Sequence, residues 1–165
     1  MNTKKMVIYG ILLTIAAVGQ IILAVFLYDP EANALVINLG WGVLMLSAIF
    51  GWLPIFTFRR RGQVQGRGYM RTTVLVDSGI YGIVRHPQYL AGILMNIALS
   101  LMATHWSVIA LGIVAAIINY LNTYDEERSC IEKFGEDYLR YKQKVPRLNF
   151  VLGIIRAIRR TREST

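Results

Sequence analysis

Charged residues are scarce in this sequence, and cysteine is almost absent. Only 17% of the 165 residues are charged, whereas 55% are hydrophobic. A typical soluble domain contains about 25% charged residues, so this composition points to a membrane protein. Cys130 is the single cysteine, which excludes a disulfide within the chain and a metal site made of several cysteines. We expect no bound metal, and we expect Cys130 to pack as a small apolar residue on a helix face.

Four long apolar runs contain very few polar residues, among them Gln20, Asn96 and Ser100. A hydrocarbon core of about 30 Å needs about 20 mostly apolar residues in each helix that spans it. We therefore predict four transmembrane helices, near residues 6–27, 38–58, 88–103 and 107–123. The predicted fold is all-α and polytopic, one domain over residues 1–165, with a hairpin of the third and fourth helices and a cytoplasmic amphipathic C-terminal region.

Basic residues are missing from two of the predicted connections. Residues 28–37 and 104–106 hold no Lys or Arg, and all 18 basic residues fall on the other side of the predicted membrane. By the positive-inside rule that side is cytoplasmic, and both termini lie there. The net charge of +8 then matches anionic lipid headgroups. We expect membrane lipids as partners, and no nucleic acid.

Two segments remain for the cytoplasmic side, residues 59–87 and 124–165. The first opens with RRRGQVQGRGYMRT, whose Arg and Gly content predicts irregular structure. The second begins with apolar residues every three or four positions, which predicts an amphipathic helix that Gly135 breaks or bends. The tail LNFVLGIIRAIRR mixes isoleucine with arginine in a pattern that suits a helix lying in the membrane interface.

In the stretch SGIYGIVRHPQYLAGILM, Arg85, His86 and Pro87 stand side by side at the point where the sequence becomes apolar. Proline is favoured at the first position of a helix, so the third helix should begin at Pro87. Its free backbone N–H groups would favour an anionic group such as a carboxylate, and Arg85 would add a full positive charge. The alternative is an interfacial anchor, in which the arginine reaches the headgroups and the proline only starts the helix.

Three acids, Asp125, Glu126 and Glu127, follow the fourth apolar run. A helix C-terminus disfavours acids unless the helix continues or a cation pairs with them. A tight hairpin of the third and fourth helices would bring Arg85 and His86 opposite Glu126 and Glu127. Such a cluster suits a zwitterion with a carboxylate and an amine. The structural alternative is a solvated Arg85–Glu127 salt bridge, which would contribute little to stability.

The order and spacing of these motifs resemble the isoprenylcysteine carboxyl methyltransferase family and its phospholipid N-methyltransferase relatives. The resemblance covers residues 73–148 and rests on Leu75, Val76, Gly79, Tyr81, Arg85 to Tyr89, Glu126, Glu127, Phe134, Gly135, Tyr138, Tyr141, Val145 and Pro146. It implies a membrane-embedded methyltransferase that uses S-adenosylmethionine at the cytoplasmic face and takes a lipophilic acceptor from the bilayer. It assigns no catalytic residue, since a general base is needed only if the acceptor arrives protonated.

The resemblance also implies a set of site residues. The cofactor pocket would be formed by Thr73, Val74, Leu75, Val76, Tyr81, His86, Pro87, Gln88, Tyr89 and Glu126. The substrate would meet Asn122, Arg85 and Glu127. The carboxyl methyltransferases have an arginine at the position of Asn122, and an asparagine cannot neutralise a carboxylate. The acceptor therefore stays open between a prenylcysteine, an amine headgroup and a small lipophilic acid or thiol.

Two alternatives of different classes remain. A sterol-reductase-like enzyme using NADPH would share Arg-His-Pro-x-Tyr and the Cys and Lys-aromatic-Gly spacing of ERSCIEKFGEDYLRYKQKVP. Such reductases are longer, however, and favour Asp-Glu where this sequence has Glu126 and Glu127. A non-catalytic membrane adaptor would require the polar cluster to be purely structural.

Overall fold

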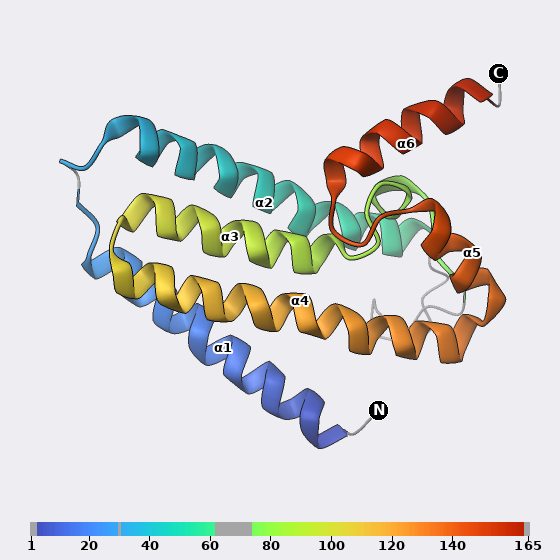
Figure 1. Ribbon diagram of the computed structural model, residues 1–165, viewed down its shortest axis with the longest axis horizontal. Helices are drawn as coiled ribbons and strands as arrows, with labels where there is room; N and C mark the ends of the chain where they lie inside the picture. The colour runs from blue at the N-terminus through green and yellow to red at the C-terminus, as the bar shows by residue number, and fades with distance from the viewer. Residues whose placement is uncertain (1–2, 30, 62–73, 164–165) are drawn as a thin grey trace. The chain divides into compact units, whose positions relative to one another are not determined.

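The computed structural model describes residues 3–29, 31–61 and 74–163, and all the regular structure in these ranges is helical. The elements, shown in Figure 1, are α1 (Thr3–Phe26), α2 (Ala34–Arg61), the short 3-10 helix η1 (Gly79–Gly82), α3 (Pro87–Ala103), α4 (Trp106–Phe134), α5 (Glu136–Lys144) and α6 (Phe150–Glu163). The predicted all-α class is confirmed, and so are the helix start at Pro87 and the tight hairpin between α3 and α4.

Three helices, α1, α2 and α4, are long and apolar enough to cross a membrane. The apolar helix α3 is shorter, with 17 residues. A polytopic membrane protein is therefore confirmed, whereas four passes remain a prediction. The irregular segment was predicted from residue 59 onward, and its start was wrong because α2 continues to Arg61. The rest of that prediction, residues 62–73, lies outside the described residues.

Helix α4 continues beyond the predicted end at residue 123 and stops at Phe134. Gly135 follows with a φ of +54°, a left-handed conformation that favours glycine, and α5 begins at the next residue. The predicted break at Gly135 is thus confirmed. The apolar positions on both sides of the break still share one cluster, in which Tyr138, Tyr141 and Val145 are buried.

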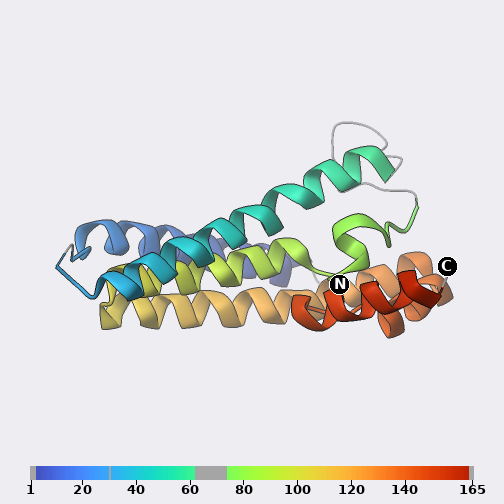
Figure 2. The same ribbon diagram turned by 90° about the horizontal axis from the view of Figure 1, so that it is seen from above.

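The chain forms two compact units, and the first comprises Met1–Ile49 and Tyr89–Asp125. Within it α3 and α4 run side by side (Figures 1 and 2). Gln20 of α1 is fully buried, and its Nε2 donates to the Asn96 carbonyl at 2.9 Å, the Ser100 hydroxyl at 3.2 Å and the Val108 carbonyl at 3.2 Å. Gln20 of α1 thus meets the polar positions Asn96 and Ser100 of α3, and with the Val108 carbonyl of α4 these bonds link α1 to the hairpin.

The second unit comprises Phe50–Gln88 and Glu126–Thr165. In Figure 2 the green segment that contains η1 runs between the end of α2 and α6. Tyr81 of this segment stacks edge-on against Phe58 of α2, with ring centroids 4.7 Å apart. On the other side, α6 approaches Ile83 so closely at Gly153 that a β-carbon there would lie 1.9 Å from the Ile83 carbonyl oxygen. The segment that carries Arg85 and His86 is therefore held from both sides.

Candidate functional site

A single carboxylate, that of Glu127, organises the second unit. Arg85 binds its Oε1 through Nη2 at 2.6 Å and Nε at 3.1 Å. Arg147 binds both oxygens, through Nη2 to Oε2 at 2.7 Å and Nε to Oε1 at 3.0 Å. Lys142 lies 3.2 Å from Oε2, and His86 Nε2 lies 3.4 Å from Oε1. We call these five residues the Glu127 cluster.

The centre of the Glu127 cluster is buried, which the sequence did not predict, whereas Lys142 at its edge is 39% exposed. The Glu127 side chain is 4% exposed and the Arg85 side chain is 6% exposed. The Arg85–Glu127 salt bridge is therefore present, but it is shielded from water instead of solvated. Counting Arg85, Lys142 and Arg147 against one carboxylate, these contacts bring two more positive charges than negative ones together.

Backbone hydrogen bonds fix the position of the cluster. The Arg85 N–H donates to the Pro146 carbonyl at 3.0 Å, and the His86 N–H donates to the Arg147 carbonyl at 3.2 Å. Arg85 Nη1 also donates to the Lys142 carbonyl at 2.7 Å. These bonds tie the residues before α3 to the segment after α5. Glu127, on α4, then joins both segments by charge.

Tyr141 of α5 strengthens this connection. Its hydroxyl donates to the Tyr81 carbonyl at 2.7 Å, and its side chain is buried. Burial, with the neighbouring Tyr138, raises the pKa of the Tyr141 phenol well above its ordinary value. Tyr141 therefore keeps its proton and remains a hydrogen-bond donor at neutral pH.

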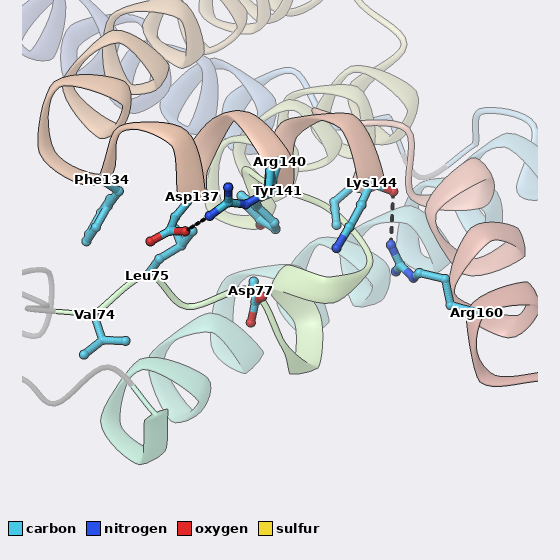
Figure 3. Close-up of a pocket in the computed structure, with 10 residues that line it drawn as sticks. Val74, Leu75, Asp77, Phe134, Asp137, Arg140, Tyr141, Lys144 and Arg160 are labelled. Atoms are coloured by element: carbon cyan, nitrogen blue, oxygen red, sulfur yellow. Dashed lines mark hydrogen bonds and ion pairs between the residues drawn. The ribbon is translucent and has the colours of Figure 1, made fainter. Parts of the chain in front are cut away.

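Beside this core lies a cavity of about 630 Å³, shown in Figure 3. Its lining residues are Val74, Leu75, Asp77, Phe134, Asp137, Arg140, Tyr141, Lys144, Val145 and Arg160. Figure 3 shows the α5 side chains on one side of the cavity and Val74, Leu75 and Asp77 on the other. We call it the α5 cavity. Its wall combines apolar residues with charges of both signs, which suits a ligand that is itself part apolar and part zwitterionic.

The predicted cofactor residues fall into three groups. Val74 and Leu75 line the α5 cavity. Val76, Tyr81, His86 and Pro87 are buried in the second unit, and Gln88 and Glu126 are half-buried there. Tyr89, half-buried, belongs to the first unit together with the predicted substrate residue Asn122, and Thr73 lies outside the described residues. Arg85 and His86 contact Glu127.

Sequence reasoning missed several residues that the structure brings into the site. Asp137, Arg140 and Lys144 line the cavity together with Tyr141. Their spacing of three and four residues places them on one face of a helix, so this signal was present in the sequence. Lys142 and Arg147 of the Glu127 cluster and Arg160 of the cavity carry no such signal, because their contacts depend on how separate segments pack.

Comparisons with known proteins agree with the resemblance in the motifs. The family model described as phospholipid methyltransferase matches residues 35–137. The protein-S-isoprenylcysteine O-methyltransferase of Mus musculus is 36% identical over 88 residues, which cover 50% of this chain and 30% of that protein. The methanethiol S-methyltransferase of Pseudomonas deceptionensis is 30% identical over 112 residues, which cover 65% of this chain and 40% of that protein.

A reductase is also similar. The delta(14)-sterol reductase of Methylotuvimicrobium alcaliphilum is 29% identical over 150 residues, covering 78% of this chain and 35% of that protein. The matched regions thus span 30–40% of the length of the three relatives. The family match by itself extends over more than half of the chain. This protein therefore belongs to the phospholipid methyltransferase family.

Proposed function

We propose that this protein is a membrane methyltransferase that takes a methyl group from S-adenosylmethionine and transfers it to a lipophilic acceptor delivered by the bilayer. The observation that supports the proposal most directly is the α5 cavity, whose lining includes Val74 and Leu75 of the family motif. Membership of the family and the methyltransferases among its relatives support the same reaction class.

S-adenosylmethionine fits the residues of the α5 cavity. It has a carboxylate, an amine and a sulfonium centre joined to a flat aromatic base. Arg140, Lys144 and Arg160 suit the carboxylate, whereas Asp77 and Asp137 suit the two cationic groups. The apolar surface of Leu75 and Phe134 suits the base. A cavity of about 630 Å³ also lies within the usual range of small-molecule sites, about 300–1,000 Å³.

The bound cofactor would supply an electrophilic methyl group. The chain's own residues would align the acceptor with it and exclude water, which is most of what an in-line displacement requires. The Glu127 cluster and the Tyr141–Tyr81 bond would hold the cavity wall rigid for this purpose. His86, Pro87, Gln88, Tyr89 and Glu126 remain proposed cofactor contacts, with Asn122, Arg85 and Glu127 proposed for the substrate side. We place the site and both termini on the cytoplasmic side of a four-pass protein.

Binding measurements on the purified protein test the proposal. We expect S-adenosylmethionine to raise the midpoint of thermal unfolding and NADPH to leave it unchanged. Asp77→Asn and Lys144→Gln should each weaken cofactor binding, since losing a hydrogen bond to a charged group costs about 1.5–3 kcal/mol, roughly ten- to a hundredfold in affinity. Arg156→Gln, at an exposed position of α6, is the matched control and should bind as wild type.

A second pair of variants tests whether motif residues outside the α5 cavity also contact the cofactor. His86→Ala and Glu126→Ala should also weaken binding if the proposed contacts of these residues are correct. Wild-type affinity in both of them, with loss in the cavity variants, would restrict the cofactor to the α5 cavity. Stabilisation by NADPH in place of S-adenosylmethionine would reject the methyltransferase and support the reductase alternative.

A further inference from the structure

Helix α6 packs against the rest of the second unit along one side. Gly153 lies against the Ile83 carbonyl, and Arg160 Nη2 donates to the Gly82 carbonyl at 2.6 Å. Phe150, at the start of the helix, packs against Phe50 of α2 with ring centroids 5.3 Å apart. At 100° per residue, Gly153 and Arg160 point in nearly the same direction from the helix axis. This direction is the attached side of α6.

Away from the attached side, α6 exposes a row of apolar side chains. Val151, Ile154, Ile155 and Ile158 are 55%, 42%, 44% and 51% exposed. Their spacing of three, one and three residues puts them within about 100° of each other around the helix. We call these four residues the α6 stripe. An exposed apolar row of this kind marks a surface that contacts a membrane or a protein.

Positive charges border the α6 stripe. Arg162 lies one turn beyond Ile158 on the same face, Arg159 lies at the edge of the stripe, and Arg156 lies farther round. All three arginines are exposed. Arginine beside an exposed apolar face is the composition of helices that lie in the headgroup region of anionic membranes.

The position of α6 along α2 places it toward the basic end of that helix. Helix α2 has 28 residues, more than the about 20 that cross a hydrocarbon core of about 30 Å, and it ends in Arg59, Arg60 and Arg61. Phe50, which contacts Phe150, lies in the half of α2 that leads to these arginines. Trp52, 65% exposed, is an aromatic residue of the kind enriched at membrane interfaces. The start of α6 thus lies beside the half of α2 that leads toward the headgroups.

We propose that α6 is an interfacial anchor that binds anionic phospholipids. The α6 stripe enters the outer edge of the hydrocarbon core, and Arg159 and Arg162 contact phosphate groups. A second copy of the chain is a less suitable occupant. A two-fold interface places the same surface against itself, so the arginines that border the stripe would face their own counterparts and repel them.

The test uses the full-length protein in lipid nanodiscs and a fluorescence readout, so it is independent of methyltransferase activity. Cys130→Ser removes the single cysteine, and Ile155→Cys or Arg156→Cys then carries an environment-sensitive fluorophore. The two labelled positions are adjacent in sequence but lie about 100° apart around the helix, with only position 155 in the α6 stripe. Cys130→Ala replaces Cys130→Ser if the serine lowers the midpoint of thermal unfolding.

In discs that contain phosphatidylglycerol, we expect blue-shifted emission at position 155 and severalfold stronger quenching there by nitroxide lipids than at position 156. Replacing phosphatidylglycerol by phosphatidylcholine, or introducing Arg159→Gln with Arg162→Gln, should reduce this difference. Equal quenching at both positions would overturn the proposal. Blue-shifted emission at 155 without lipid quenching would indicate a second copy instead. Quenching that does not depend on the charge of the lipid would reject the role of the arginines.

Discussion

At the residue scale, Glu127 is a buried carboxylate with several cationic partners. Arg85 and Arg147 both bind it through two nitrogens, and Lys142 and His86 complete the contacts. Taking charges out of water is costly, so each member of such a cluster depends on the others. The cluster joins the segment before α3 to the segment after α5, and its integrity should decide whether the second unit keeps its shape.

Glu127→Ala should destabilise the protein by about 3–5 kcal/mol, because it leaves the buried Arg85 without its counter-charge. Thermal unfolding in one detergent measures the effect. The matched control is the exposed ion pair of Asp137 and Arg140, whose side chains are 68% and 64% exposed. Asp137→Asn should change stability by less than about 1 kcal/mol. Similar losses of stability in Glu127→Ala and Asp137→Asn would mean that the Glu127 cluster contributes no more to stability than an exposed ion pair does.

Asn122 is the residue that we expect to select the acceptor of the proposed enzyme. It lies one helical turn before Glu126 on α4, and an asparagine cannot neutralise a carboxylate. Asn122→Arg should shift the preference toward carboxylate acceptors, because a guanidinium binds a carboxylate through two parallel hydrogen bonds. An amine acceptor would be repelled. Methylation rates of a prenylcysteine analogue and an amine-headgroup lipid should be compared in both proteins, and an unchanged ratio would remove residue 122 from the acceptor site.

At the scale of elements, close helix packing in the first unit depends on glycine. A β-carbon on Gly112 of α4 would lie 2.5 Å from Gln20 Nε2 and 2.8 Å from the Ser100 hydroxyl. Gln20 has no room to move aside freely, since it is fully buried and bonds to α3 and α4. Small residues at such crossings let membrane helices approach each other closely.

Gly112→Ala should therefore destabilise the protein by about 1–3 kcal/mol through overpacking. Gly42→Ala in α2 is the matched control, because a β-carbon there meets nothing within 4 Å and alanine favours a helix. Thermal unfolding of both variants measures the difference. Adding Gln20→Ala to Gly112→Ala should relieve part of the loss, and purely additive effects would mean that the two residues do not compete for space.

At the scale of the whole molecule, the distribution of basic residues predicts the orientation of the protein in the membrane. The connection between α1 and α2 and the turn between α3 and α4 hold no basic residue, which predicts that both lie outside the cytoplasm. A cysteine at Glu31, in a chain with Cys130→Ser, should react with a membrane-impermeant maleimide added to intact cells. A cysteine at Arg156 should react only after the membrane is opened. The reverse result would mean that the topology is inverted relative to this prediction.

The sequence alone determined the features that depend on neighbours along the chain. Apolar runs predicted the helices, Pro87 marked the start of α3, and Gly135 marked the break before α5. The ordered motifs also identified the family before any contact was known. Each of these signals lies within one or two helical turns, or in the order of short motifs, and so needs no knowledge of packing.

Only the tertiary structure decided which residues meet across those elements. Gln20 lies 76 residues from Asn96, yet the two are joined by a hydrogen bond in the first unit. Of two adjacent glutamates, Glu127 receives the cations because its side chain points into the second unit. The sequence predicted the amphipathic character of α6, but which of its faces is attached follows from the contact of Gly153 with Ile83. Helical periodicity tells which residues share a face, whereas packing between distant segments decides what that face contacts.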